Sequence, residues 1–426
     1  MKSLKINENE GLEFAKISGD RNLIHINKSA GYNSLFGHPI VHGVLIIIKF
    51  LKSIKYNNNF KIIEIIFKEA IKYNVDITIK SIKKNKNYNF ELKQNNNICA
   101  YINLIFFEKK IEINNFDKIN FSKIYFTKNI KNKFSSRYID PNLLTSLMFL
   151  SKYVGNEYPG KNSLISEIRI NKINDNNYNK IFIKSSLLDK RFPIINNLLL
   201  NKNYKINFKT LIRPKLEIKL DSPNQRLIKK INLIKNNILI IGASSGIGKD
   251  LLELFTINKN IQIIGTYFQN KINLKKRNLI LYKIDVQKDL DKIFEIIKMY
   301  SPLNIYYFPT PKINIRSDDT ELTKLYKNYY IKYPIKILKF SNQYDNNFFY
   351  PSTTFINKKK FSNYVKIKFQ KEKKISKLKL KNININILRI PEINTKQNLS
   401  LIDKKLINFR NLLNLDADIL EKVFFK

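Results

Sequence analysis

Cysteine is almost missing from this chain of 426 residues, and its single cysteine, Cys99, excludes a disulfide within the chain. Such a chain suits a reducing compartment, so we expect a cytoplasmic protein. Long apolar runs are missing too: charged residues interrupt the first segment, and the apolar run Val44–Ile48 is too short to cross a bilayer. We therefore expect no secretory signal and no membrane insertion, with Cys99 in an apolar core.

Acidic residues are scarce, with 34 Asp and Glu against 77 Lys and Arg, a formal charge of +43. Such an excess, taken alone, would indicate a nucleic-acid or anionic-membrane partner. The lysines, however, are spread along the whole chain, with no basic arm, no zinc-ligand spacing and no recognisable nucleic-acid module. We expect a lysine-coated surface that attracts anionic ligands such as coenzyme phosphates, and no nucleic-acid partner and no bound metal.

The length predicts two or three domains, and the hydrophobic content of 43% is enough for folded cores. Residues 1–110 and 111–220 have mixed helix and strand patterns, and residues 236–426 alternate strand and helix. We expect 221–235, with Pro223 and scattered charges, to be a linker.

Glycine is also rare, yet three of the 11 glycines lie in Ile238–Gly248, which reads ILIIGASSGIG. A buried-strand pattern runs into the glycines, and a helical pattern follows. Gly242 would allow a tight turn, Gly246 would let backbone approach a pyrophosphate, and Gly248 would let the helix pack on the strand. The helix N-terminus would favour phosphate. The alternative is an ordinary strand–turn–helix whose glycines serve turn geometry alone.

The spacing G-x-x-x-G-x-G, with Ser244 and Ser245 inside it, resembles the short-chain dehydrogenase/reductase family. Further strands are expected in that family's order at 261–266, 279–284, 304–308, 348–350 and 385–390. The resemblance implies a doubly wound α/β Rossmann-like sheet and a nicotinamide cofactor. It implies that the cofactor-binding residues are Gly242, Ser244, Ser245, Gly246, Ile247, Gly248, Asp285, Val286, Tyr364 and Lys368. Asp285 and Val286 would contact the adenine ring.

Tyr364-x-x-x-Lys368 matches the catalytic pair of that family. One helical turn separates the two residues, so both face the same way. A nearby ammonium would lower the pKa of the Tyr364 phenol and allow it to exchange a proton with a carbonyl oxygen. The resemblance implies that Lys368 also holds the nicotinamide ribose. Ser352 or Thr353 would hydrogen-bond the substrate oxygen.

Several positions depart from the family's pattern. Phe308-Pro-Thr-Pro311 replaces N-N-A-G, Glu392 replaces the glycine of P-G-x-x-x-T, and either Asn328 or Tyr330 stands at the place of the catalytic Asn. These changes still predict that the domain binds a dinucleotide, and they make catalytic reduction by it the weaker expectation. The second strand ends without a carboxylate for a ribose 2′-OH and has Lys271 close by, which favours NADP, with NAD as the alternative.

The three histidines all fall between Phe14 and Leu45. The segment contains Ser18-Gly-Asp20-x-Asn22-x-Ile-His25 and Ile40-Val-His42-Gly43. It resembles the MaoC-like, (R)-specific enoyl-CoA hydratase family, which has the hotdog fold. For His38 we expect an ordinary packed histidine.

The resemblance implies addition of water to an enoyl thioester, or its reverse. That reaction needs a base for water, an acid for the α-carbon and a donor to the enolate oxygen. Asp20 and His25 would act on one water, Asn22 would help to hold them, and the Gly43 N–H, at the start of an apolar helix over 44–54, would suit the thioester oxygen. The alternative for Asp20 is a turn or helix-cap role.

Strand patterns follow that helix at 61–67, 75–82, 88–93 and 98–107. A polar, irregular connection is expected over 111–133. A helix at 141–154 and strands at 163–173, 180–187 and 204–212 then repeat the order, which predicts a second hotdog repeat without catalytic residues that shapes an acyl tunnel. An unrelated α+β insert is the alternative.

Together these patterns predict a bifunctional enzyme on acyl-CoA or acyl-carrier thioesters. Its first part would be a hydratase or dehydratase, and its second an NADP-linked 3-ketoacyl reductase. One alternative is a hydratase with a catalytically impaired nucleotide-binding domain. The other is a non-enzymatic acyl- or nucleic-acid-binding protein. Both families commonly self-associate, which implies a homodimer.

Overall fold

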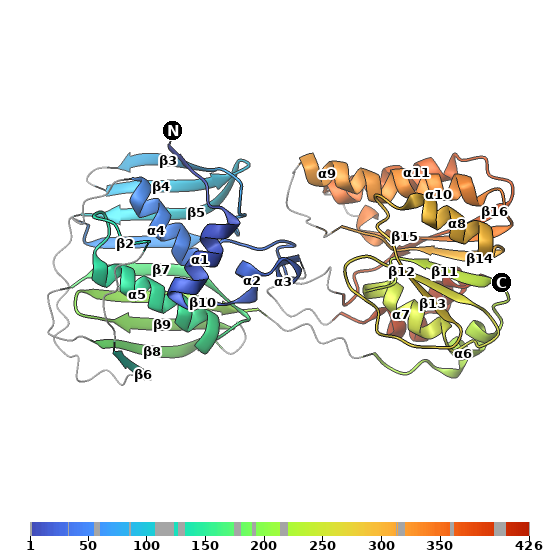
Figure 1. Ribbon diagram of the computed structural model, residues 1–426, viewed down its shortest axis with the longest axis horizontal. Helices are drawn as coiled ribbons and strands as arrows, with labels where there is room; N and C mark the ends of the chain where they lie inside the picture. The colour runs from blue at the N-terminus through green and yellow to red at the C-terminus, as the bar shows by residue number, and fades with distance from the viewer. Residues whose placement is uncertain are drawn as a thin grey trace. The chain divides into compact units, whose positions relative to one another are not determined.

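The computed structural model forms two compact units, one from the described residues up to 213 and one from those at 220 and beyond (Figure 1). The structure describes residues 2–425 with the exception of 33, 55–59, 85–86, 107–122, 127–132, 174–179, 190–192, 214–219, 312, 314–319, 358–361 and 396–405.

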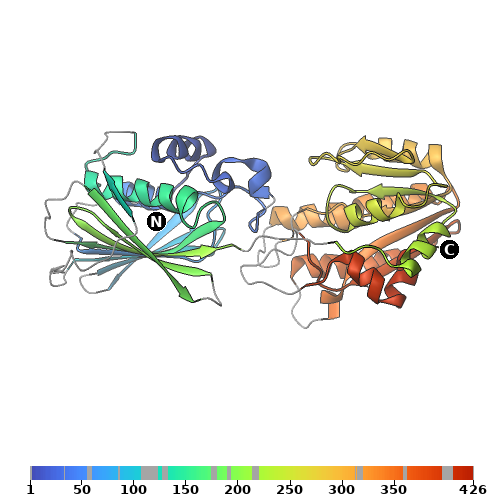
Figure 2. The same cartoon turned by 90° about the horizontal axis from the view of Figure 1, so that it is seen from below.

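The first unit is a ten-stranded antiparallel sheet with helices on one face (Figures 1 and 2). Its helices are α1 (Glu8–Ser18), α2 (Leu23–Ile26), α3 (Lys28–Tyr32), α4 (Gly43–Ser53), α5 (Pro141–Lys152) and the π-helix η2 (Tyr153–Glu157). Its strands are β1 (Lys2–Leu4), β2 (Ile62–Phe67), β3 (Ile77–Lys84), β4 (Asn87–Gln94), β5 (Asn97–Ile105), β6 (Lys123–Phe126), β7 (Ser163–Lys172), β8 (Lys180–Asp189), β9 (Ile194–Leu200) and β10 (Tyr204–Ile212).

The two halves of this sheet have the same strand order. The first half has the order β1-β3-β4-β5-β2, and the second has the order β7-β10-β9-β8-β6, so the second repeats the first in reverse across the sheet. The two halves are joined where β2 pairs with β7. In each half, a long helix, α4 or α5, is followed along the chain by four of the five strands. The run from Val44 to Ile48 in α4 is buried on all sides, because this helix lies between the sheet and neighbouring helices.

Three expectations for this region need correction. The connection expected to be irregular contains β6, which pairs with β8 at the sheet edge. Its other residues, apart from Lys133, lie outside the described part. The strand β9 was not expected, because Asn196 and Asn197 interrupt its apolar pattern; Asn197 is nevertheless buried and hydrogen-bonded to Thr210. The expected linker contains helix α6 (Gln225–Asn232), which buries Leu227 and Ile231 in the second unit's core.

The second unit is a six-stranded parallel sheet in the order β13-β12-β11-β14-β15-β16. This is the strand order of dinucleotide-binding folds. Its strands are β11 (Asn237–Ile241), β12 (Ile263–Tyr267), β13 (Leu279–Lys283), β14 (Leu303–Tyr307), β15 (Asn346–Thr353) and β16 (Ile383–Ile390). Its other helices are α7 (Gly246–Phe255), α8 (Leu290–Tyr300), α9 (Thr320–Lys327), η3 (Asn328–Lys332), α10 (Tyr333–Ser341), η4 (Thr354–Asn357), α11 (Asn363–Ser376), α12 (Phe409–Leu415) and α13 (Ala417–Val423).

Both faces of this sheet are covered, so successive residues of β11 alternate between two cores. Ile238 and Ile240 pack with α6, α7, α12 and α13, whereas Leu239 and Ile241 pack with α8 and α10. This explains the unbroken apolar run before the glycines. Within the described residues, no helix is long and apolar enough to cross a bilayer.

Candidate functional sites

Asp20 lies on a short turn between two helices of the first unit. Helix α1 ends at Gly19, whose φ of 80° is the left-handed conformation that glycine adopts readily. Asn22 then caps α2 with its side-chain oxygen, 3.4 Å from the Ile24 amide nitrogen. This helix–turn–helix aims Asp20 inward, and Asp20 is only 4% exposed.

The Asp20 carboxylate is held by two donors from distant parts of the chain. The backbone N–H of Asn22 donates to Oδ1 at 3.2 Å, and the hydroxyl of Ser151, on α5, donates to Oδ2 at 2.6 Å. A charged acceptor makes both bonds stronger than ordinary ones. The carboxylate is therefore fixed in one orientation.

His25 is presented by α2 with a defined tautomer. Its Nδ1 lies 2.8 Å from the carbonyl oxygen of Ile40, which can only accept, so Nδ1 carries the proton and Nε2 keeps its lone pair. Burial lowers the pKa of His25 and outweighs the Asp20 charge, which raises it; the charge of Arg213 also lowers it. The imidazole is therefore neutral near pH 7, with Nε2 free to take a proton.

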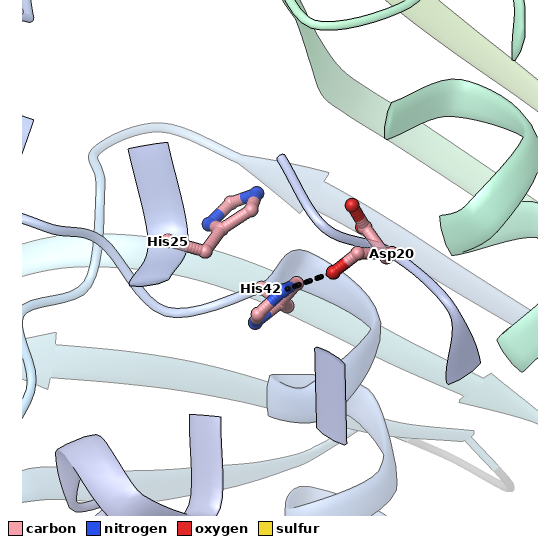
Figure 3. Close-up of side chains that lie close together, drawn as sticks. All are labelled: Asp20, His25 and His42. Atoms are coloured by element: carbon pink, nitrogen blue, oxygen red, sulfur yellow. Dashed lines mark hydrogen bonds between the residues drawn. The ribbon is translucent and has the colours of Figure 1, made fainter. Parts of the chain in front are cut away.

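His42 supports His25 from below (Figure 3). The two rings stack with centroids 4.0 Å apart. His42 is fully buried, its Nε2 donates to the backbone oxygen of Asp20 at 3.4 Å, and its Nδ1 accepts from the Tyr73 hydroxyl at 3.4 Å. Burial holds the pKa of His42 well below its ordinary value.

Side-chain ligand atoms of Asp20, His25 and His42 all lie within 4.8 Å of one another, a spacing that a metal ion could bridge. The hydrogen bonds argue against that use. Both nitrogens of His42 are already engaged, and so is Nδ1 of His25. Of these three residues, only the Asp20 carboxylate and Nε2 of His25 remain available. These two groups suit proton transfer, but they are too few ligands for a protein metal site.

The second half of the sheet contributes contacts that the sequence did not predict. Asn156 Nδ2 donates to the backbone oxygen of Gly19, and its Oδ1 accepts from the Arg21 N–H at 3.3 Å. A Cβ on Gly155 would stand 2.1 Å from Oδ1 of Asp20, so only glycine fits there. No motif marks these residues; only the pairing of the two halves brings them to Asp20.

The other expected residues of this site are placed as follows. Gly43 is the first residue of α4, so its N–H is not used by the helix's own ladder. His38 Nδ1 donates to the oxygen of Pro39 at 2.9 Å, away from the pair. Cys99 is buried.

In the second unit, the glycine-rich turn has the geometry expected from its sequence. Gly242 has φ +82°, and a Cβ on Gly248 would lie 2.4 Å from the Gly242 oxygen, so the helix packs directly on the strand end. Gly246 has φ +57°, and a Cβ there would meet only Thr395 Cγ2, at 4.0 Å. The space beside the α7 N-terminus, which Ser244, Ser245 and Ile247 flank, therefore fits the approach of a phosphate group.

The expected adenine-contacting residues follow β13. The Oδ1 of Asp285 accepts the N–H of Gln287 at 3.0 Å, and Val286 is buried. This places both at the carboxyl end of the sheet, where ligands of doubly wound folds bind.

Thr353, and not Ser352, faces Tyr364. Its hydroxyl lies close enough to the Tyr364 phenol to act on the pKa of that phenol, which it lowers. Ser352 instead donates to Glu372, which is also paired with Arg389 at 2.7 Å. The sequence left the choice between Ser352 and Thr353 open, and these contacts favour Thr353.

Lys368 does not act on Tyr364 as the spacing predicted. Its Nζ donates to the Pro351 oxygen at 2.8 Å and lies 4.3 Å from the centroid of the Tyr330 ring. Burial lowers the pKa of Lys368 to about 7, and burial raises the pKa of Tyr364 above its ordinary value. The predicted lowering of the Tyr364 pKa is wrong for this arrangement, because desolvation of the phenol exceeds any gain from the amine.

Of the two residues that the sequence offered for this place, Asn328 and Tyr330, it is Tyr330 that packs against Tyr364. Tyr330 is 2% exposed, its ring packs edge-on against Tyr364 with centroids 5.6 Å apart, and its hydroxyl bonds Thr310. Thr310 belongs to the Phe-Pro-Thr-Pro stretch, so the two departures from the family pattern contact each other.

Residues 1–94 match the family model of the MaoC like domain, so this part of the chain is MaoC-like. No curated protein sequence matches the chain. The second unit has the parallel sheet and the glycine-rich turn of a Rossmann-like fold, as expected from its resemblance.

Similar solved structures include two short-chain dehydrogenases. One, from Burkholderia cenocepacia in complex with NADP, is 9% identical, covers 44% of this chain and 85% of that chain, and has a TM-score of 0.37. The other, from Leptospira borgpetersenii with bound NAD+, is 12% identical, covers 50% and 92%, and also scores 0.37. An epimerase from Methanothermobacter thermautotrophicus is 16% identical and scores 0.33; the match covers 39% of this chain and only 55% of that chain.

Proposed function

We propose that the protein is a bifunctional enzyme of acyl-thioester metabolism, whose first unit hydrates enoyl thioesters or dehydrates 3-hydroxyacyl thioesters of (R) configuration. The observation that carries the proposal is the pair of the buried Asp20 and the half-buried His25, with Nε2 of His25 free and the carboxylate fixed. The pair lies within the MaoC-like residues. Family members of this kind act on acyl-CoA thioesters.

The proton steps follow from which atoms are free. A water between the Asp20 carboxylate and Nε2 of His25 gives up a proton to the pair as its oxygen attacks the β-carbon. That same proton is delivered to the α-carbon, so the pair returns to its starting state after each turnover. Dehydration runs through the same steps in reverse.

The charge that develops on the thioester oxygen needs a donor, and the backbone N–H of Gly43 would supply it. It begins an 11-residue helix whose dipole favours negative charge at this end. A glycine here also leaves room for the thioester, because a Cβ would already lie 3.2 Å from the Phe67 ring.

The second half of the sheet acts in this proposal as a second hotdog repeat. It has no acid–base pair of its own among the described residues, but it supplies Ser151, Gly155 and Asn156 to the Asp20 turn. Its equal strand order supports a double hotdog unit. One chain would then provide what two copies of a single repeat provide elsewhere.

For the second unit we propose an NADP-linked reductase of 3-ketoacyl thioesters. The turn Gly242–Gly248 and the residues Asp285 and Val286 would hold the dinucleotide, which supplies hydride when bound. Thr353 and Tyr364 lie close to each other and would together contact the substrate carbonyl oxygen, where Tyr364 would deliver the proton. Both reactions would then act on one acyl group.

One observation favours a second candidate, a nucleotide-binding domain without turnover. The Tyr330 ring is buried against Tyr364 and lies under Lys368, so it occupies space that an amide side chain would leave open. Oxidation of NADPH by acetoacetyl-CoA separates the two candidates. Activity that Tyr364→Phe abolishes supports the reductase, and no oxidation at any acyl length supports the second candidate.

The hydratase half is tested with crotonyl-CoA and a His25→Gln variant. The amide of glutamine cannot take up a proton, so hydration is expected to be lost. His38→Gln is the matched control, because His38 bonds only its neighbour Pro39 and lies outside the pair. Equal activity in His25→Gln and the wild type would contradict the assignment of His25.

A further inference from the structure

Arg213 is a partly buried cation without an anionic partner. It follows directly after β10, and its Nη2 donates to the oxygen of Lys161 at 2.6 Å. Its Nε is buried and makes no hydrogen bond. Among the described residues no carboxylate pairs with it. A buried, incompletely bonded guanidinium is costly unless something supplies the missing acceptor.

The surroundings place Arg213 beside the Asp20–His25 pair. Its backbone N–H donates to the Asn162 oxygen at 2.6 Å. The loop that contains Asn162 is hydrogen-bonded to η2, because the Gly160 N–H donates to the Val154 oxygen at 3.0 Å. The next residue of η2, Gly155, touches the Asp20 carboxylate. The Arg213 charge also acts on His25, whose pKa it lowers.

We propose that the guanidinium of Arg213 binds an anionic oxygen group of the thioester substrate beside the catalytic pair. The inference rests on the proposed hydratase function and adds to it a residue that determines substrate choice. A planar guanidinium with a free Nε suits two oxygens of one carboxylate or phosphate. Two parts of the substrate carry such groups: a terminal carboxylate on the acyl chain, and the phosphates of the CoA or carrier arm.

Binding of three unreactive thioesters distinguishes these sources without turnover. Butyryl-CoA has phosphates only, glutaryl-CoA has phosphates and an acyl carboxylate, and S-butyryl-N-acetylcysteamine has neither. Their dissociation constants are measured by calorimetry on the wild type and on Arg213→Gln. Arg169→Gln is the control, since Arg169 pairs with Glu64 on β2, outside the site. Thermal unfolding of each variant checks that the fold is intact.

If Arg213 binds the acyl carboxylate, Arg213→Gln should weaken the binding of glutaryl-CoA about 10- to 100-fold and leave the binding of the other two thioesters unchanged. A phosphate ligand predicts an equal loss for both CoA esters and none for the third. Unchanged binding of all three, or an equal loss for all three, overturns the proposal. Hydration of crotonyl-CoA is measured in parallel, so a protein that binds these esters without hydrating would fail the proposed function while the role of Arg213 stands.

Discussion

The hydroxyl of Ser151 donates to Oδ2 of Asp20 at 2.6 Å, across 131 positions of sequence. The two residues belong to different halves of the ten-stranded sheet. The second half of the sheet therefore orients the Asp20 carboxylate, which belongs to the first half. Mutation of Ser151 can measure the effect of this contact.

Ser151→Ala is expected to lower kcat for hydration about 10-fold and to leave KM nearly unchanged. The change removes one hydrogen bond to a charged group, worth about 1.5 kcal/mol. Ser151→Thr keeps a hydroxyl and is expected to recover part of the loss. Ser146→Ala is the control, because Ser146 lies on the same helix, is fully buried and bonds Asn201 instead. Equal kcat values for the two alanine variants would contradict the role given to Ser151.

The pH dependence of hydration is expected to report His25. Burial holds its pKa below the ordinary value of about 6.5, so kcat/KM should fall on the acid side only below that pH, as Nε2 becomes protonated. Asp20 raises this pKa and Arg213 lowers it. Arg213→Gln removes the positive charge, so the acid inflection should move upward. A rate profile whose inflection stays fixed or moves downward in this variant would be inconsistent with these charges.

Sequence patterns predicted the local turns and helices around the candidate sites better than they predicted the edges of the fold. The motif around Asp20 and His25 and the glycine turn are local, so spacing alone placed each on its helix or turn. The strand β9 was missed because Asn196 and Asn197 interrupt its apolar pattern, and the edge strand β6 because it lies in a segment expected to be irregular; both strands pair with β8. The helix α6 was taken for a linker, although Leu227 and Ile231 are four residues apart and share one face.

Contacts between distant segments could not be predicted from the sequence. Ser151 on α5 and Gly155 and Asn156 on the π-helix η2 have ordinary residue types, and only the pairing of β2 with β7 explains why they reach Asp20. The predicted effect of Lys368, a lowered pKa of the Tyr364 phenol, was wrong. Spacing gives the face of a helix, but it does not reveal that the amine is buried under Tyr330.

Lys371 is expected to reduce the stability of the second unit. It is fully buried on α11, its Nζ has no hydrogen-bond partner, and burial holds its pKa well below the ordinary value. The unfolded chain binds a proton below about pH 10.4 that the folded chain does not bind. The free energy of unfolding should therefore fall as pH is lowered from that value toward the depressed pKa.

Lys371→Met removes this penalty and is expected to raise the free energy of unfolding by about 1–3 kcal/mol at pH 7 and to flatten its pH dependence. Urea unfolding followed by far-ultraviolet circular dichroism measures both effects. Lys366→Met is the matched control, since Lys366 lies exposed on the same helix. A Lys371→Met variant that is less stable than the wild type at pH 7 would refute the assignment of Lys371 as a destabilising amine.

Hydration of crotonyl-CoA by the wild type, beside Asp20→Asn, tests the proposed hydratase most directly. Asparagine keeps the shape of the side chain but removes the charge and the basicity, so the rate should fall about 10²- to 10⁴-fold. Asp140→Asn serves as the control, because Asp140 also accepts two hydrogen bonds, from backbone N–H groups, but caps α5 away from the pair. Hydration that is lost only in Asp20→Asn establishes the acid–base site. A wild type inactive on enoyl-CoA esters of several lengths, or an Asp20→Asn variant as active as the wild type, would contradict it.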